Sequence, residues 1–394
     1  MRIGLPPVGR ADRSPLARWF WTIDRPLLCL MLVLMGVGVI AVAAASPAAA
    51  RRLSDAAFRL PPLHFLERQL LWLALALPLM LGISMLAKEA ARRFALAGFL
   101  LMLLLLALVA VPGIGMEKNG AVRWIAVGGL QIQPVEFLKP CFVVTTAWLL
   151  ALRFTDRSLP VVAVGAMLLA PLLALLVLQP DYGQAALITA VWLVQAALAG
   201  LPLAVVGVIA VAGAAGIAVA YRFEPHIRHR IDGFLHGEGD TYQVDRALDC
   251  FRSGGLYGTG PGQGVAKFRL PEAHTDYIFS VIGEEFGAIA CFALALLYLA
   301  IVLRVLLQLL DENDPFTMIA ATGLVTMFGG QALINMAVNV ALAPSKGMTL
   351  PFVSHGGSSF LATAVGVGLL LALTRRNRHL KASPYLSPEA AAAA

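Results

Sequence analysis

The sequence predicts an all-α integral membrane protein with about ten transmembrane helices. Hydrophobic residues make up 59% of the chain and charged residues only 13%, whereas soluble proteins carry about 25% charged residues. Apolar runs of about 18 residues or more recur along the whole length, and each can cross the hydrocarbon core of a bilayer. These observations exclude a soluble globular fold.

The apolar runs divide the chain into three parts. We expect a cytoplasmic N-terminal segment at 1–26, a polytopic membrane domain at 27–374 and a disordered cytoplasmic tail at 375–394. The eighth run is longer than one span needs, so we expect it to project beyond the bilayer. The predicted spans are 27–45, 68–87, 94–112, 135–152, 159–178, 183–199, 202–221, 277–309, 316–341 and 358–374.

The first apolar run has two interpretations. Arg18 and Arg25 precede it and small residues surround Ser46, as in a cleavable signal peptide. The run from Leu27 to Ala45 is, however, longer than the apolar core of a signal peptide, which has about 7–15 residues. We therefore predict an uncleaved first helix.

Positive charges predict the side of the membrane on which each loop lies. Ten spans place both termini on one side, which carries 15 Lys and Arg residues against seven on the other, once 222–276 is left out. That exclusion is justified because long loops cross the membrane largely regardless of charge. Both termini are therefore predicted to be cytoplasmic, and 113–134 and the large loop 222–276 to be periplasmic. So long a loop is rarely structureless, so we expect it to be functional and partly folded.

The distribution of charges and cysteines argues against a nucleic-acid-binding protein and against a disulfide-stabilised one. The net charge of +7 comes from short clusters between apolar runs, not from the continuous basic stripe of a nucleic-acid-binding protein. The four cysteines are scattered. They have no metal-ligand spacing, and they do not predict a disulfide framework.

Several polar residues fall within or beside predicted spans, where ionisable groups are functional candidates. Glu136 and Lys139 are three residues apart, so they share a helix face and could form a structural ion pair or a functional one. Asp181 lies in a predicted turn, where it is either functional or a helix cap. Asn335 and Asn339 are four apart, which favours hydrogen bonding between helices.

The densest chemistry lies between Leu270 and Gly287. Asp276 is predicted at the outer mouth of the eighth helix, with Ser280 and Glu284 on the same helical face. A carboxylate between water and a low-dielectric cleft is a plausible general base. The alternative is an N-terminal cap that stabilises the helix dipole, which is the commoner duty of an aspartate at such a position.

A glycine-rich run precedes this stretch, from Gly254 to Gly264, and ends near Lys267 and Arg269. Its spacing matches neither a P-loop nor a dinucleotide fingerprint. Backbone amides and two cations could hold a pyrophosphate there. A mobile loop without a ligand fits the pattern equally well.

Taken together, these segments resemble the SEDS family (shape, elongation, division and sporulation) over nearly the whole chain, from Leu27 to Leu373. The division-type members are more similar than the elongation-type ones. Departures from the family pattern are His355 for Tyr, Val135 for Ser and Tyr182-Gly183-Gln184 for Leu-Gly-Thr. The resemblance rests on QPVEFLK (133–139) with the preceding 119–124 block, QPDYG (179–183), the 253–287 stretch with PEAHTD (271–276), and the block from Asn339 through PSKG (344–347) to LPFVSHGGSS (350–359).

The resemblance implies a glycosyltransferase that polymerises lipid II into β-1,4-linked glycan strands with inversion. Asp276 matches the catalytic aspartate of the family and would act as the general base. Charge on the leaving pyrophosphate would be stabilised by basic side chains or by a divalent cation, Mg²⁺ or Mn²⁺, and no organic cofactor is implied. The implied substrate-binding residues are Arg123, Glu136, Lys139, Asp181, Lys267, Arg269, His274, Lys346 and Ser358.

The resemblance also implies partners and a location. We expect a class B penicillin-binding transpeptidase (FtsI-like) and division membrane proteins of the FtsQ, FtsL and FtsB type, at the septum of the bacterial inner membrane. Three other functions are weighed against this one: a lipid II flippase or other transporter, a non-enzymatic scaffold, and an elongation-type polymerase of the same family. No inverted repeat typical of transporters is visible between the two halves.

Overall fold

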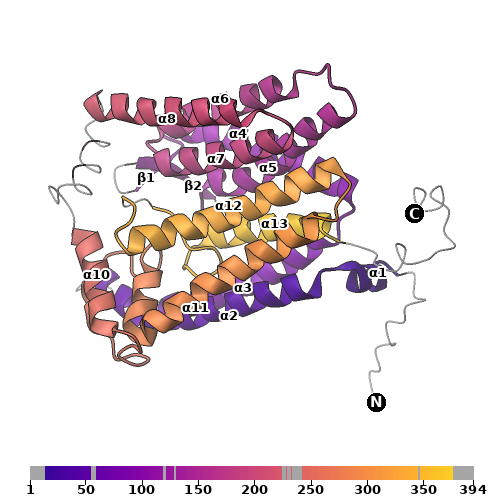
Figure 1. The fold of residues 1–394 in the computed structure, drawn as a ribbon. Helices are drawn as coiled ribbons and strands as arrows, with labels where there is room; N and C mark the ends of the chain where they lie inside the picture. Colours follow the sequence, from indigo (N-terminus) through magenta and orange to yellow (C-terminus); the bar gives the residue numbers. More distant parts are fainter. Residues whose placement is uncertain are drawn as a thin grey trace, which may run out of the picture.

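The structure is a computed structural model that describes residues 14–54, 59–118, 121–127, 130–223, 228, 232, 242–344 and 347–375. Ten apolar helices among these residues lie side by side, with their axes aligned along a common direction (Figure 1). They follow the ten predicted spans in order, which confirms the fold class. The helices are α2 (Arg25–Leu53), α3 (His64–Ser84), α4 (Lys88–Val109), α5 (Pro134–Ala151), α6 (Val161–Leu178), α7 (Tyr182–Leu198), α8 (Leu203–Phe223), α11 (Ile278–Leu309), α12 (Pro315–Asn339) and α13 (Gly357–Leu373).

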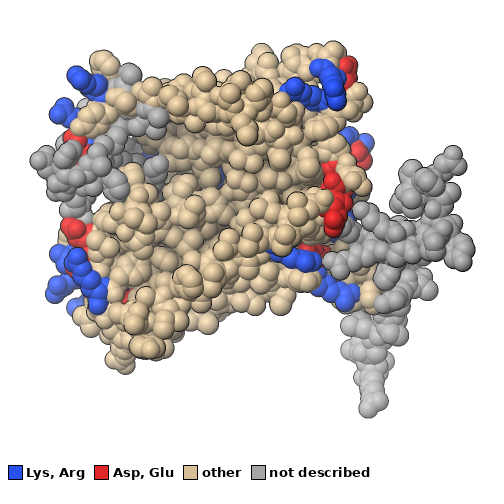
Figure 2. Space-filling view, in the orientation of Figure 1, with Lys and Arg blue, Asp and Glu red and all other residues tan. Residues whose placement is uncertain are grey.

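Charged side chains gather at the two ends of this helix bundle. Figure 2 shows Lys, Arg, Asp and Glu at both ends of the face in view and an uncharged band between them. Among the described residues, seven helices are long and apolar enough to cross a membrane, and α7, α13 and Leu203–Gly213 of α8 are shorter apolar helices. The chain is therefore a multi-pass membrane protein.

Helices α5, α12 and α13 form the centre of the bundle. In the 18-residue stretch of each helix that could cross the membrane, 72% of α5 and 56% of α12 are buried inside the protein, against 22% of α3 and 22% of α4. Helix α13 packs against α3 and α5, and α12 packs against α5, α7 and α11. The polar residues of these central helices must therefore find partners inside the protein.

Both long segments predicted outside the membrane are partly folded. In the first, β1 (Met116–Lys118), β2 (Ala121–Val127) and β3 (Leu130–Ile132) form an antiparallel sheet in that order. In the second, α10 (Tyr242–Gly254) and the 3₁₀ turn η2 (Ala266–Arg269) pack on α11. Figure 1 shows α10 at the opposite end of the molecule from the short helix α1 (Pro15–Thr22).

Helix α11 is interrupted at Gly287, where φ is 82° and ψ is 174°. The part after the break, 288–309, is about 33 Å long at 1.5 Å per residue, which is enough to span the hydrocarbon core. The excess length of the predicted eighth span therefore lies before the break. Directly after the break the amides of Ala288 and Ile289 donate to the carbonyls of Gly255 and Leu256, at 2.9 and 3.3 Å.

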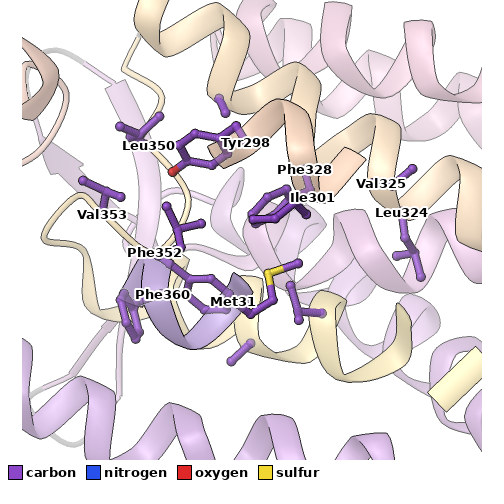
Figure 3. Packing of buried hydrophobic residues seen from close by; sticks show 14 of the residues in the cluster. Met31, Tyr298, Ile301, Leu324, Val325, Phe328, Leu350, Phe352, Val353 and Phe360 are labelled. Atoms are coloured by element: carbon purple, nitrogen blue, oxygen red, sulfur yellow. The ribbon is translucent and has the colours of Figure 1, made fainter. Parts of the chain in front are cut away.

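The connection between α12 and α13 enters the interior of the bundle. Leu350, Phe352 and Val353 are at most 1% exposed, and Figure 3 shows Phe352 among apolar side chains that include Met31 of α2. A non-helical backbone is tolerated at such a place only where the protein satisfies its polar groups. Here Tyr298 of α11 donates its hydroxyl hydrogen bond to the carbonyl of Pro351 at 2.6 Å.

Gly38→Ala is expected to destabilise the protein, because α2 touches this buried connection at Gly38. A Cβ there would lie 2.2 Å from the carbonyl oxygen of Phe352, and overpacking of this kind costs about 1–3 kcal/mol. The measurement is the midpoint of thermal unfolding of the purified protein in detergent. Gly36→Ala is the control, because nothing lies within 4 Å of its Cβ and alanine favours a helix. Equal midpoints for the two variants would contradict the close packing.

Candidate functional site

Glu136 and Lys139 form a buried ion pair on α5, as their spacing predicts. Lys139 Nζ lies 3.0 Å from Glu136 Oε1, and the side chains are 2% and 6% exposed. The same ammonium donates to Gln184 Oε1 at 3.0 Å and to Gln331 Oε1 at 2.8 Å. Gln184 Nε2 donates in turn to Glu136 Oε1 at 2.7 Å. All three ammonium protons therefore have acceptors inside the bundle.

A pocket lies beside this pair, between α5, α12 and α13. Glu136, Lys139 and Gln331 supply its polar wall, and the remaining walls are mostly apolar, with Phe328 and Leu370 among them. An apolar pocket with a few convergent polar groups is a typical ligand site. This arrangement suits an amphiphilic molecule better than a fully polar one.

Arg123 connects the outer sheet to the turn between α6 and α7. From β2, its Nε donates to Gln179 O at 2.9 Å and its Nη2 to Pro180 O at 2.7 Å. Its Nη1 lies 3.9 Å from Asp181 Oδ2. Burial raises the pKa of Asp181, and the charge of Arg123 opposes that rise. The structure thus brings together two predicted site residues that lie far apart in the sequence.

Asp276 lies in the turn that leads into α11 and is half-buried. Its backbone carbonyl accepts hydrogen bonds from Asn335 Nδ2 at 2.8 Å and from Asn339 Nδ2 at 2.9 Å. Its carboxylate lies beside the buried connection, because a Cβ placed on Gly347 would be 3.4 Å from Asp276 Oδ2. The predicted hydrogen bonding of the two asparagines between segments is confirmed.

The expectation that Asp276, Ser280 and Glu284 share a helical face is wrong at Asp276. Helix α11 begins at Ile278, and its N-cap position belongs to Tyr277. Asn339 Oδ1 accepts hydrogen bonds from the Ser280 amide at 3.1 Å and from its hydroxyl at 2.7 Å. The first turn of the helix is thus stabilised by α12.

Two buried acids of α11 hold the glycine-rich run and the residues that follow it, so the amides of Gly262, Ala266 and Lys267 are not free for a pyrophosphate. Glu284 Oε1 and Oε2 accept from the amides of Ala266 and Lys267 at 2.7 and 2.8 Å. Glu285 Oε2 accepts from the Gly262 amide at 3.0 Å. These contacts favour a folded structural loop over the mobile one.

Lys267 does not present its charge to a ligand, in contrast to the prediction. Its side chain is 1% exposed, its ammonium pairs with Glu285, and it donates to Ala44 O at 2.9 Å. Sequence alone places a lysine after a glycine run, but it does not show that an acid 18 residues later neutralises it. Arg269, in contrast, is exposed, and its carbonyl accepts from the Tyr242 hydroxyl at 3.1 Å.

His274 packs in an aromatic cluster beside Asp276. Its ring centroid lies 4.3 Å from that of Phe65 and 5.7 Å from that of His355. Its carbonyl accepts from the His355 amide at 2.8 Å, and His355 Nδ1 lies 3.2 Å from Gln69 Oε1. Helix α3 and the buried connection therefore hold the turn that carries Asp276.

The stability of the protein is expected to fall as the pH drops below 6.5. Burial, reinforced by the charges of His274, Arg68 and His64, lowers the pKa of His355 from 6.5 to about 3. Between these values the unfolded chain binds a proton that the folded chain does not take up. Each pH unit below 6.5 should therefore remove about 1.4 kcal/mol of stability, measured as a falling midpoint of thermal unfolding.

His355→Gln is the matched variant for this pH dependence. Its amide can still donate to Gln69 Oε1, but it does not titrate. The variant should show a flatter dependence of the unfolding midpoint between pH 7.5 and 5. An unchanged slope would contradict the assignment to His355.

Two predicted residues remain. Ser358, at the start of α13, is 5% exposed, and its hydroxyl has no hydrogen-bond partner among the described residues. It is therefore available to a ligand that reaches it. Lys346 lies outside the described residues.

Sequence reasoning missed Gln184 and Gln331, which complete the coordination of Lys139. Both glutamines could have been singled out, because an amide side chain in an apolar helix needs a hydrogen-bond partner. The sequence does not show which partner each one binds, since Gln331 lies 192 residues from Lys139.

Comparison with known proteins agrees with this architecture. The family model FTSW_RODA_SPOVE, described as a cell cycle protein, matches residues 25–379. The probable peptidoglycan glycosyltransferase FtsW of Caulobacter vibrioides is 40% identical over 369 residues, which cover 93% of each chain. The protein of the same description from Halorhodospira halophila is 35% identical over 377 residues, or 92% of this chain and 93% of the relative.

Solved structures show the same fold. A chain from a peptidoglycan synthase complex, studied for the coordination of polymerization and crosslinking, has a TM-score of 0.70 and 29% identity over 89% of this chain and 97% of its own. The rod shape determining protein RodA of Thermus thermophilus has a TM-score of 0.64 and 29% identity over 89% and 96% of the two chains. The family model and the relatives cover nearly the whole chain, and the chain belongs to the SEDS family of cell cycle proteins.

Proposed function

We propose that this protein is a peptidoglycan glycosyltransferase that polymerises lipid II into β-1,4-linked glycan strands during septal cell-wall synthesis. The names of its FtsW relatives support the activity. The observation that carries the proposal is the placement of Asp276. The residue is half-buried, and two buried amides fix its backbone. A catalytic base needs this combination of access and fixed position.

In the proposed reaction Asp276 accepts the proton of the 4-hydroxyl group of the acceptor GlcNAc. The hydroxyl oxygen forms a bond to the anomeric carbon of the donor MurNAc. The bond from that carbon to the lipid diphosphate breaks, the diphosphate leaves with the electron pair, and the configuration inverts. One base suffices, because diphosphate is a good leaving group that needs little protonation.

Positive charge near the diphosphate would stabilise the leaving group. We assign this role to residues among Arg123, Arg269 and Lys346. We assign Glu136, Lys139, Asp181, His274 and Ser358 to substrate binding, because Glu136 neutralises the charge of Lys139. Lys267 is left out, because Glu285 neutralises it. Among the described residues no three His, Cys, Asp or Glu side chains form a cluster that could hold a metal ion. No step is therefore routed through Mg²⁺ or Mn²⁺.

The proposal extends to the partners and the location of the protein. We propose a complex with a class B penicillin-binding transpeptidase, and with FtsQ-, FtsL- and FtsB-like proteins, at the septum of the inner membrane. The similarity to a chain of a peptidoglycan synthase complex supports such an assembly. Both termini would be cytoplasmic and the loop that carries Asp276 periplasmic.

The test is polymerisation of purified lipid II by the purified full-length protein, with and without the transpeptidase. Polymer should form in detergent, where no membrane gradient exists. A flippase or a scaffold would yield none under either condition, and that result would overturn the proposal. Septal rather than lateral fluorescence of the tagged protein would separate the division role from the elongation role.

A further inference from the structure

One face of α12 carries three buried amide side chains at four-residue steps. Gln331, Asn335 and Asn339 are 5%, 2% and 0% exposed, and this spacing places them one above another along the helix. We call them the amide ladder. A buried amide without partners is unfavourable, so each of them must be explained by the groups that it binds.

The outer end of the ladder fixes the backbone of Asp276. Asn335 and Asn339 both donate to its carbonyl, and Asn339 Oδ1 accepts from the amide and hydroxyl of Ser280. The residue proposed as the base and the first turn of α11 are therefore both fastened to α12. Any shift of these amides would move the carboxylate.

The ladder also fixes the segment that lies against the Asp276 carboxylate. The second amide hydrogen of Asn335 is donated to Met348 O at 2.7 Å, and Gln331 Nε2 donates to Thr349 O at 3.0 Å. Gly347, the neighbour of the Asp276 carboxylate, directly precedes these two residues. One helix, α12, thus holds both the backbone of Asp276 and the segment next to its carboxylate.

The inner end of the ladder meets the buried ion pair. Gln331 Oε1 accepts from Lys139 Nζ at 2.8 Å while its other end holds Thr349. Hydrogen bonds therefore link Lys139 to Gln331 and Gln331 to Thr349, and the adjacent Met348 links this segment to Asn335 and so to Asp276. No other described side chain bonds both to the Glu136–Lys139 pair and to the segment beside Asp276.

We propose that the amide ladder is a positioning device for the glycosyl transfer, in which Gln331 joins the Glu136–Lys139 pair to the Asp276 site. The inference rests on the proposed function. A base must be held in reach of the proton that it accepts, and a displacement of about 1 Å can lower a rate by about 10²-fold. The ladder residues act through Asp276 and do not touch the reacting atoms.

The test is steady-state kinetics of lipid II polymerisation by the full-length protein. Asn335→Leu and Gln331→Met keep similar volumes and remove the amide bonds. Each should lower kcat by about 10–10²-fold per folded molecule and leave KM nearly unchanged, because positioning affects the transition state more than binding. The double variant should lose less than the product of the two single losses, since the residues act as one unit.

Gln195→Met is the matched control. Gln195 is 0% exposed and bonds to Thr146 and to the carbonyl of Val143, but it lies outside the ladder. Its variant should keep the wild-type kcat. An equal loss in this control, or a raised KM with unchanged kcat in Gln331→Met, would overturn the proposal.

The remaining outcomes separate this inference from the proposed function. Wild-type kcat in both ladder variants, with Asp276→Asn inactive, would overturn the ladder alone. An inactive wild type would overturn the proposed function. If Asn335→Leu fails to fold, Gln331→Met still decides the matter, because it leaves both bonds to the Asp276 carbonyl intact.

Discussion

Asp276→Asn is expected to lower the rate of lipid II polymerisation by about 10²–10⁴-fold, the usual contribution of a general base. The amide has the size of the carboxyl group but cannot accept the acceptor's proton. The fold should tolerate it, because the bonds from Asn335 and Asn339 reach the backbone carbonyl and not the side chain. Asn also caps helices about as well as Asp, so the start of α11 should be preserved.

The measurement is the initial rate of polymer formation by variant and wild type at equal amounts of folded, membrane-inserted protein. The transpeptidase should bind both equally. A rate above about a tenth of the wild-type rate would exclude Asp276 as the base. Glu136 would then be the next carboxylate to replace.

Lys139→Met is expected to lower the stability by about 3–5 kcal/mol, because it leaves Glu136 charged and buried without its cation. The side chains of the pair are only 2% and 6% exposed, and Gln184 alone cannot neutralise the carboxylate. Glu136→Gln should be harmful for the converse reason. The double variant with both changes should be more stable than Lys139→Met, since no unpaired charge remains.

Unfolding midpoints of the four proteins form a double-mutant cycle for this pair. Lys88→Met is the control, because Lys88 pairs with Asp314 at the same 3.0 Å distance but with side chains 43% and 39% exposed. Breaking this exposed pair should cost at most about 1 kcal/mol. Strictly additive losses at Glu136 and Lys139 would contradict a direct interaction.

The sequence was sufficient for the helices and for the local part of the site. Each span is an apolar run, and Glu136 and Lys139 meet because three residues make almost one helical turn. The outer sheet was missed, because strands such as β1 and β3 have only three residues each. So short a segment carries no detectable alternation of polar and apolar residues.

The errors concern contacts between distant segments. Lys267 and Glu285 were both visible in the sequence, but only the folded loop brings their charges together. Asp276 was predicted at the mouth of the eighth helix on one face with Ser280 and Glu284, whereas α11 begins at Ile278 and Asp276 lies in the turn before it. The links from α12 to Asp276 span about sixty residues, a separation that no local pattern encodes.

The break at Gly287 fixes the angle at which the membrane rod of α11, 288–309, meets the outer part of the helix. Both parts are fastened to the glycine-rich run and the residues that follow it, the outer one through Glu284 and Glu285 and the rod through the amides of Ala288 and Ile289. A side chain at Gly287 would meet Leu256 O at 2.3 Å, so only glycine fits at this joint. Helices accommodate a thicker or thinner bilayer by tilting, and a tilt of this rod would therefore also pull on the glycine-rich run.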